Sequence, residues 1–258
     1  FPSTIAHNAT TSERSSCDDF CNQLQYSMNR MLPLEIRLFR LQLAPYEMST
    51  KRIWHATQSS SSKWYSYRFT LGPTLLNPLE RFVRTHIVHR PSFAPTSSCG
   101  RPYALTIDDI ARLKSILEVY VGTHDFKAFG GQLEQNEKRS GKKMNTIRTI
   151  HKVELVKESF EFDPTCSSEL KKDQGFFIGE EGNYRIEFLI EGALYKMVRN
   201  MVGAAIQVWL GNMKQAQLVE LLQIDESGDV EKSRKDNPCK PAPPEGLTLE
   251  CVYYNDLF

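Results

Sequence analysis

The amino-acid sequence predicts an α+β protein in which helices back β-sheets. Apolar and polar residues alternate at 64–70 and at 184–190, which is the period of strands that bury one face. At 110–120 and 193–210, apolar residues recur three and four positions apart, as in helices with one apolar side. Because these strands and helices interleave along the chain, we expect the two kinds of element to pack on each other.

The first part of the chain is predicted to contain a helix and two strands. Apolar residues at helical spacing place the helix at 18–31, after a polar loop at 8–16. A loose alternation favours a strand at 36–43, and a cleaner one favours the strand at 64–70. A serine-rich stretch at 58–62 is interpreted as a loop between them.

A segment at 90–102 with three prolines and a glycine is predicted to link two domains, at 1–90 and 91–258. At the start of the second domain, T-I-D-D at 106–109 is typical of a capped helix start. The elements expected after it are the helix up to Gly122, a loop at 130–146, a strand at 147–156, a charged insertion at 157–182, the strand at 184–190, the helix at 193–210, a loop at 225–244 and a strand at 247–253.

The composition excludes a protein that binds nucleic acid through charge spread over its whole surface. Hydrophobic residues make up 40% of the 258 residues, charged residues make up 24%, and the formal net charge is +1. This proportion of apolar residues is ordinary for a globular protein with a sizeable core. Any RNA site must therefore be a local basic patch.

Cysteine usage predicts no metal site. Of the six cysteines only Cys17 and Cys21 lie close together, in C-D-D-F-C, without a second pair or a histidine at zinc-finger spacing. Reduced thiols in an intracellular protein are the better interpretation. No stretch predicts a membrane span, and residues 1–10 do not resemble a signal peptide. Because the first residue is Phe1, we expect the gene product to begin earlier; the sequence leaves the compartment open between an organelle, the cytoplasm and the nucleus.

Two basic segments are candidates for binding an anion. On the helix at 193–210, Lys196, Arg199, Asn200 and Gly203 share the side opposite the apolar residues, where they could receive a phosphate or a carboxylate. The second segment, 138–152, contains Lys142, Lys143 and Arg148 among six Lys or Arg and no acidic residue. From the residues alone, a solvated basic face is the favoured interpretation of the first segment, and for the second both RNA contact and a solvated loop stay open.

The first of these segments resembles a motif of the TruA-like tRNA pseudouridine synthases. Residues 191–203 read E-G-A-L-Y-K-M-V-R-N-M-V-G, similar to the strand, turn and helix with M-V-R-N-(M/I)-V-G in that family. Further stretches match in the family's order. They are N-R-M-L-P-L-E-I at 29–36, Arg52 ahead of H-A-T at 55–57, K-W-Y-S-Y-R-F at 63–69, G-T-H-D-F-K-A-F at 122–129, T-I-R at 146–148 and A-P-P-E-G-L-T-L at 242–249.

The resemblance implies a fold, a reaction and a set of site residues. The fold is the two-lobed pseudouridine synthase fold, with antiparallel sheets and flanking helices around a central cleft. The reaction is the isomerisation of uridine to pseudouridine in tRNA or another structured RNA, without metal or organic cofactor. Arg199 would pair with the catalytic aspartate and Tyr65 would stack on the target base, although a strand aromatic in the core is an open alternative for Tyr65. The RNA-binding residues would be Arg52, Lys63, His124, Lys142, Lys143, Arg148, Lys196 and Asn200.

The family's catalytic aspartate lies in a G-R-T-D loop, and these 258 residues contain no such sequence. Asp18 and Asp19 stand in S-S-C-D-D-F-C, which is a different context. Three interpretations stay open: the enzyme is longer than this chain, another chain supplies the aspartate, or the protein is an inactive relative. An inactive relative would be an RNA-binding subunit of a ribonucleoprotein or of a ribosome-associated complex. The RNA partner is tRNA or rRNA, and the family often forms homodimers.

Overall fold

The computed structural model describes residues 11–44, 46–47, 52–56, 59–72, 80–87, 105–158, 180, 182–224 and 233–254, with the backbone alone at 11–17, 46–47 and 52–53. The chain divides into two compact units, one formed by Phe1–Ser60 with Tyr254–Phe258 and the other by Ser61–Tyr253. The predicted linker at 90–102 and most of the insertion at 157–182 lie outside the described residues. The predicted domain boundary at 90 stays a prediction.

The first unit contains helix α1 (Thr11–Met31) and two short antiparallel strands, β1 (Tyr46–Glu47) and β2 (Arg52–Ile53). The predicted helix at 18–31 is confirmed, but it begins earlier, so 11–16 is helical rather than a loop. The strand predicted at 36–43 is wrong, because side chains of α1 bond the backbone there in place of a partner strand. The Asn29 side chain bonds both the amide and the carbonyl of Leu38, at 2.7 and 2.9 Å, and Gln25 accepts from the Leu41 amide at 2.7 Å.

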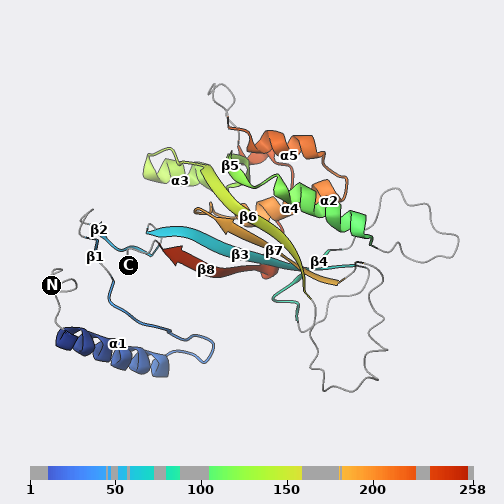
Figure 1. Cartoon of the computed structure of the whole chain (residues 1–258). Coiled ribbons are helices and arrows are strands. Elements are labelled where there is room, and N and C mark those ends of the chain that lie inside the picture. Colours follow the sequence, from blue (N-terminus) through green and yellow to red (C-terminus); the bar gives the residue numbers. More distant parts are fainter. Residues whose placement is uncertain are drawn as a thin grey trace, which may run out of the picture. The chain divides into compact units, whose positions relative to one another are not determined.

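The second unit is built on a six-stranded sheet with the order β4-β3-β7-β6-β5, and β8 pairs with β3 (Figure 1). The β3–β7, β7–β6 and β6–β5 pairs are antiparallel, whereas β3 and β4 run parallel, so the sheet is mixed rather than purely antiparallel. The strands are β3 (Ser60–Leu71), β4 (Thr85–Ile87), β5 (Gly122–Asp125), β6 (Ile147–Glu158), β7 (Gly182–Ile190) and β8 (Leu247–Tyr254). The predicted strands at 64–70, 147–156, 184–190 and 247–253 are confirmed. Residues 60–62, predicted as part of a loop, belong to β3.

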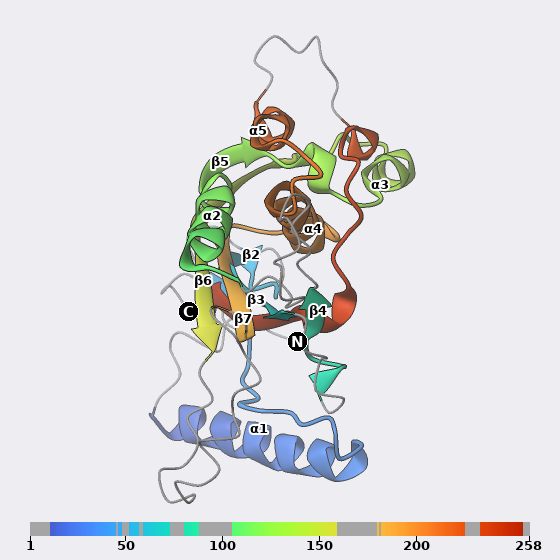
Figure 2. The ribbon, with the colours of Figure 1, turned by 90° about the vertical axis from the view of Figure 1, so that its right-hand side faces the viewer.

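Helices α2 (Ile107–Glu118) and α4 (Met197–Trp209) lie on the same face of this sheet (Figure 2). Their apolar sides meet Tyr67 and Phe69 of β3 and Phe188 of β7 in one core, in which all three rings are at most 1% exposed. Nearly every residue of α4 is buried, which is the signature of a central helix. The α+β class is therefore confirmed.

Several boundaries differ from the sequence-based expectation. Thr106 and Asp109 form the predicted capping box of α2, but this helix ends at Glu118, and Gly122 begins β5 with a φ of 112°. The segment predicted as a loop at 130–146 contains helix α3 (Leu133–Ser140). Helix α4 begins at Met197 rather than at 193, because the chain first turns at 191–196. A last helix, α5 (Gln215–Leu222), follows α4. Among the helices in the described ranges, none is both long and apolar enough to cross a bilayer.

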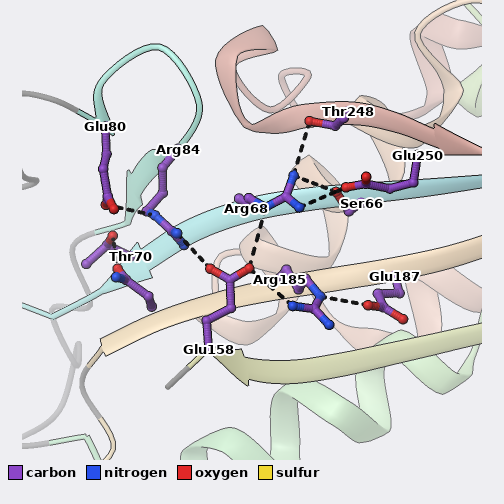
Figure 3. Close-up of polar contacts among 11 residues, drawn as sticks. Ser66, Arg68, Thr70, Glu80, Arg84, Glu158, Arg185, Glu187, Thr248 and Glu250 are labelled. Atoms are coloured by element: carbon purple, nitrogen blue, oxygen red, sulfur yellow. Dashed lines mark hydrogen bonds and ion pairs between the residues drawn. The ribbon is translucent and has the colours of Figure 1, made fainter. Parts of the chain in front are cut away.

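The other face of the sheet carries a network of arginines and carboxylates (Figure 3). Glu158, the last residue of β6, accepts from Arg84 at 2.6 Å and pairs with Arg68 and Arg185 at 3.5 Å each. Arg68 also pairs with Glu250 of β8 at 2.9 Å, so the network joins neighbouring strands. The side chain of Arg84 is only 7% exposed, so its guanidinium is largely removed from water. Glu158 is the closest carboxylate that compensates this buried charge.

Candidate catalytic and RNA-binding site

Tyr65 lies on the face of β3 that α4 covers, next to Tyr67 and about 7 Å from it along the strand. Its ring packs against the edge of the core and is half-buried, and burial raises the pKa of its phenol. The hydroxyl has no hydrogen-bond partner among the described residues, and it is not a buried atom. Tyr65 therefore combines a core contact with a hydroxyl that reaches the surface.

Arg199 lies in the first turn of α4 and is fixed by the chain that precedes β8. Its Nε donates to the carbonyl of Ala242 at 2.7 Å, and the amide of Ala242 donates to the carbonyl of Arg199 at 2.9 Å. In the part of the chain that the structure describes, no carboxylate pairs with this guanidinium. Neither terminal nitrogen is buried without a partner, so both reach the surface. This arrangement leaves two parallel donors available for an anion.

The segment at 242–246 ties Arg199 to β3. The hydroxyl of Tyr67 donates to the carbonyl of Pro243 at 2.9 Å and lies 2.9 Å from Oγ1 of Thr85. A Cβ on Gly246 would stand 2.6 Å from the carbonyl oxygen of Arg68, so only glycine allows this approach. Burial raises the pKa of Tyr67 to about 12, and the charge of Arg199 acts in the opposite direction.

One end of the sheet gathers basic residues from separate segments. In the register, Lys63 of β3 is opposite Ile190 of β7, which is also opposite Ile150 of β6. Two residues from Ile150, Arg148 of β6 is opposite His124 of β5. Residues 191–196 continue from this end of β7 toward α4, and they include the exposed Lys196. The four side chains expected to bind RNA at Lys63, His124, Arg148 and Lys196 thus come from the same end of one sheet.

The comparisons with known proteins decide the family. The model of the family described as tRNA pseudouridine synthase matches residues 116–255, more than half of the chain. The chain belongs to this family. A tRNA pseudouridine synthase A 1 of Desulfotalea psychrophila is 29% identical, over 91% of this chain and 72% of the relative. The tRNA pseudouridine synthase A 1 of Protochlamydia amoebophila is 27% identical over 91% and 69%. The tRNA pseudouridine synthase A of Lactobacillus acidophilus is 25% identical over 92% and 68%.

The family assignment confirms the resemblance and the pseudouridine synthase fold expected from it. Within that fold, the predicted basic side of the helix at 193–210 needs a correction. Asn200 is 1% exposed, donates to the carbonyl of Phe129 and accepts from Arg234 at 3.3 Å, so the expectation that it contacts RNA does not fit the structure. A Cβ on Gly203 would lie 2.2 Å from the carbonyl of Lys240. This side of α4 is therefore packed against 237–246, and of Arg199, Asn200 and Gly203 only Arg199 is partly exposed.

The remaining expected synthase residues have varied surroundings. His124 is half-buried and its Nε2 lies 3.1 Å from the carbonyl of Val121. Burial lowers the pKa of Arg148, whose terminal nitrogen donates to the carbonyl of Ile147 at 2.6 Å. Lys142 and Lys143 are exposed, just after Gly141 ends α3 with a φ of 66°. Arg52 is in β2 of the first unit, and its side chain lies outside the described residues.

Sequence reasoning missed three groups that hold the candidate site in place. They are the hydroxyl of Tyr67 and the carbonyls of Ala242 and Pro243. The A-P-P-E-G-L-T-L stretch at 242–249, which matches a family motif, contains Ala242 and Pro243 and could have pointed to these two carbonyls. Backbone carbonyls have no signature of their own in a sequence. Asp125 accepts from the Lys127 amide at 2.9 Å and from the Thr146 hydroxyl at 2.6 Å, which is a role within a turn.

Proposed function

We propose that this chain serves the isomerisation of uridine to pseudouridine in tRNA, and that Arg199 and Tyr65 belong to its catalytic site. In this reaction the glycosidic bond from C1′ to N1 breaks, the uracil turns, and C1′ bonds to C5, which releases its proton. The observation that carries the proposal is the guanidinium of Arg199, held at Nε by Ala242 while both terminal nitrogens reach the surface. The family and the names of the curated relatives support the same reaction.

Arg199 is proposed to orient the carboxylate of a catalytic aspartate. A guanidinium with two free parallel donors fits a carboxylate in a bidentate pair, which sets its distance and its plane. A fixed guanidinium also keeps the carboxylate ionised, as a nucleophile or an electrostatic stabiliser requires. No described residue supplies this aspartate, and G-R-T-D does not occur in the 258 residues. Activity is therefore to be measured on the gene product as the cell makes it.

Tyr65 is proposed to stack on the extruded target base. A uridine within a folded RNA must leave its stack before its C1′ can be attacked, and an aromatic ring compensates part of the lost stacking. The half-buried ring and accessible hydroxyl of Tyr65 suit this role. Phosphates of the RNA would be held by polar and basic side chains, for which we propose Arg52, Lys63, His124, Lys142, Lys143, Arg148 and Lys196. Because these contacts are ionic, RNA affinity should fall as salt rises.

The assembly is a separate proposal: the protein works as a homodimer or as a subunit of a ribonucleoprotein. The first unit supports an association of this kind, because it exposes large apolar side chains. Phe20 is 60% exposed, Met31 78%, Leu34 84% and Phe39 82%. Such side chains are usually covered in a working assembly. Light scattering on the gene product, with and without tRNA, separates a dimer from a complex that forms only with RNA.

The test of the function is tritium release from tRNA made with [5-³H]uridine, since formation of the bond from C1′ to C5 displaces the hydrogen on C5. Wild-type gene product should release tritium, and Arg199→Ala should reduce the rate at least about 100-fold, the loss typical of a misplaced catalytic group. Arg199→Lys should recover little, because a lysine cannot form the bidentate pair. The matched control is Arg112→Ala, an exposed arginine on α2. Tight tRNA binding without tritium release, or full activity in Arg199→Ala, would overturn the proposal.

A further inference from the structure

The turn that joins β7 to α4, residues 191–196, presents an aromatic ring that the site described above does not use. Tyr195 is 53% exposed, whereas its neighbour Leu194 is 6% exposed and Met197 is fully buried. An isolated exposed tyrosine on a mobile loop would carry no meaning. Tyr195 differs because its backbone is fixed and because Lys196 lies beside its ring.

The backbone of this turn is held at both ends. The carbonyl of Tyr195 accepts from the amide of Gly131 at 2.7 Å, and the amide of Glu191 donates to the carbonyl of Thr149 at 2.9 Å. Lys196 has a φ of 60°, a backbone conformation that residues other than glycine adopt rarely and at a cost in free energy. A Cβ on Gly131 would come within 3.1 Å of the Tyr195 ring, so ring and glycine are packed together. The direction of the ring is therefore set before any ligand binds.

The charges around the ring favour a polyanion. The Nζ of Lys196 lies 5.3 Å from the centre of the Tyr195 ring. The side chain of Arg148 lies against the same turn, because a Cβ on Gly192 would stand 3.7 Å from its Nε. The nearby acid is Glu191, whose Oε1 lies 2.8 Å from Nε2 of His151. A half-exposed aromatic ring with one cation beside it and a second cation against the same turn is an arrangement that suits the binding of unpaired nucleotides.

We propose that Tyr195 stacks on an unpaired base of the RNA other than the isomerised uridine, while Lys196 contacts the phosphate beside that base. This inference rests on the proposed function and adds a second nucleotide to its site. Tyr65 stands on the covered face of the sheet and suits the extruded target. Tyr195 stands on an exposed turn at the end of the sheet that also presents Lys63 and Arg148, where a neighbouring nucleotide would lie. The pair selects substrates in which a base next to the target is unpaired.

The first test is tRNA affinity of three variants of the gene product. Tyr195→Leu should weaken binding about 5- to 100-fold, the loss measured for one stacked base, while Tyr195→Phe should bind like wild type. Lys196→Gln should make the dependence of log affinity on log salt shallower by about 0.7 to 1, and Tyr195→Leu should leave that slope unchanged. The matched control is Phe82→Leu, because Phe82 is 73% exposed, has Arg81 4.5 Å from its ring, and lies in the segment before β4 rather than in the turn at 191–196.

The second test uses tRNA transcribed with 5-iodouridine, which crosslinks on irradiation to an aromatic side chain stacked on it. A crosslinked peptide containing Tyr195 is expected from wild type and absent from Tyr195→Leu. Wild-type affinity in Tyr195→Leu, or equal losses in Tyr195→Leu and Phe82→Leu, would overturn the inference. If wild type releases tritium from tRNA while Tyr195→Leu binds normally, only this inference fails. If wild type neither binds tRNA nor releases tritium, the proposed function fails with it.

Discussion

Arg199 and Ala242 hold each other at two points: Nε of Arg199 donates to the Ala242 carbonyl at 2.7 Å, and the Ala242 amide donates to the Arg199 carbonyl at 2.9 Å. The bond to Nε fixes the plane of the guanidinium, because this group is flat and rigid. Its position therefore depends on the segment before β8 as much as on α4. The first two predictions below concern this dependence.

Gly203→Ala should destabilise the protein and detach the segment that holds Arg199. The added Cβ would lie 2.2 Å from the Lys240 carbonyl, which is backbone and cannot move away cheaply. We expect the free energy of unfolding to fall by about 1–3 kcal/mol, measured by urea denaturation. The control is Ser115→Ala at an exposed position of α2, for which the change should stay within about 0.5 kcal/mol. Equal midpoints for the two variants would contradict the tight packing of α4 against 237–246.

Two neighbouring tyrosines on β3 should respond differently to the removal of a hydroxyl. Tyr67→Phe removes the donor to Pro243 and the partner of Thr85, and should lower the free energy of unfolding by about 1–2 kcal/mol. Tyr65→Phe should change it by less than about 0.5 kcal/mol, since this hydroxyl has no partner in the described part of the chain. Thermal unfolding measures both. A larger effect for Tyr65→Phe would show that the roles of the two hydroxyls are exchanged.

The carboxylate of Glu158 should give the protein a stability that depends on acid pH. Burial acts to raise the pKa of this group, but the hydrogen bond from Arg84 and the charges of Arg84 and Arg68 outweigh burial and hold the pKa below its usual value. Because the pKa is depressed in the folded state, the stabilisation is complete above the unfolded value of about 4.3. It is lost as pH falls through the folded value.

Glu158→Gln tests this reasoning. At pH 7 it should lower the free energy of unfolding by about 2–3 kcal/mol, since it leaves the buried Arg84 without its closest charged partner. The difference from wild type should shrink as pH is lowered from about 5 toward 3, because the wild-type carboxylate becomes protonated. Urea denaturation across this range measures both effects. The control is Glu118→Gln at the exposed end of α2, and a pH-independent difference for Glu158→Gln would reject the argument.

The lysines after α3 should contribute to RNA binding through charge alone. Changing Lys142 and Lys143 together to glutamine should weaken tRNA binding and make the salt dependence of log affinity shallower by about 2, one for each phosphate that a lysine no longer neutralises. Melting temperature should stay unchanged, because both residues are exposed. Filter binding at several salt concentrations measures the slope. Lys114→Gln on α2 is the control. If the double variant has the same salt slope as wild type, residues 142–143 belong to a solvated loop that does not contact RNA.

Local patterns predicted the elements whose residues interact with their sequence neighbours. Alternation identified β3 and β7 because one face of each is buried, and T-I-D-D marked the start of α2 because the cap is formed by adjacent residues. The strand predicted at 36–43 failed because Asn29 and Gln25 of the preceding helix α1 bond that backbone, which no alternation of residues records. Helix α3 was missed because its residues are polar and only Leu133 is buried.

The candidate site divides in the same way. Motifs alone identified the family and singled out Tyr65 and Arg199, since they record residue types at fixed spacing. Periodicity also showed which side of α4 carries Arg199, Asn200 and Gly203. Only the tertiary structure decided that 237–246 packs on that side, which buries Asn200 and leaves the end of Arg199 at the surface. The physical reason is that Arg199 is held by a backbone carbonyl more than forty residues further along the chain. Every residue has a backbone carbonyl, so no residue type in the sequence marks the one that forms this bond.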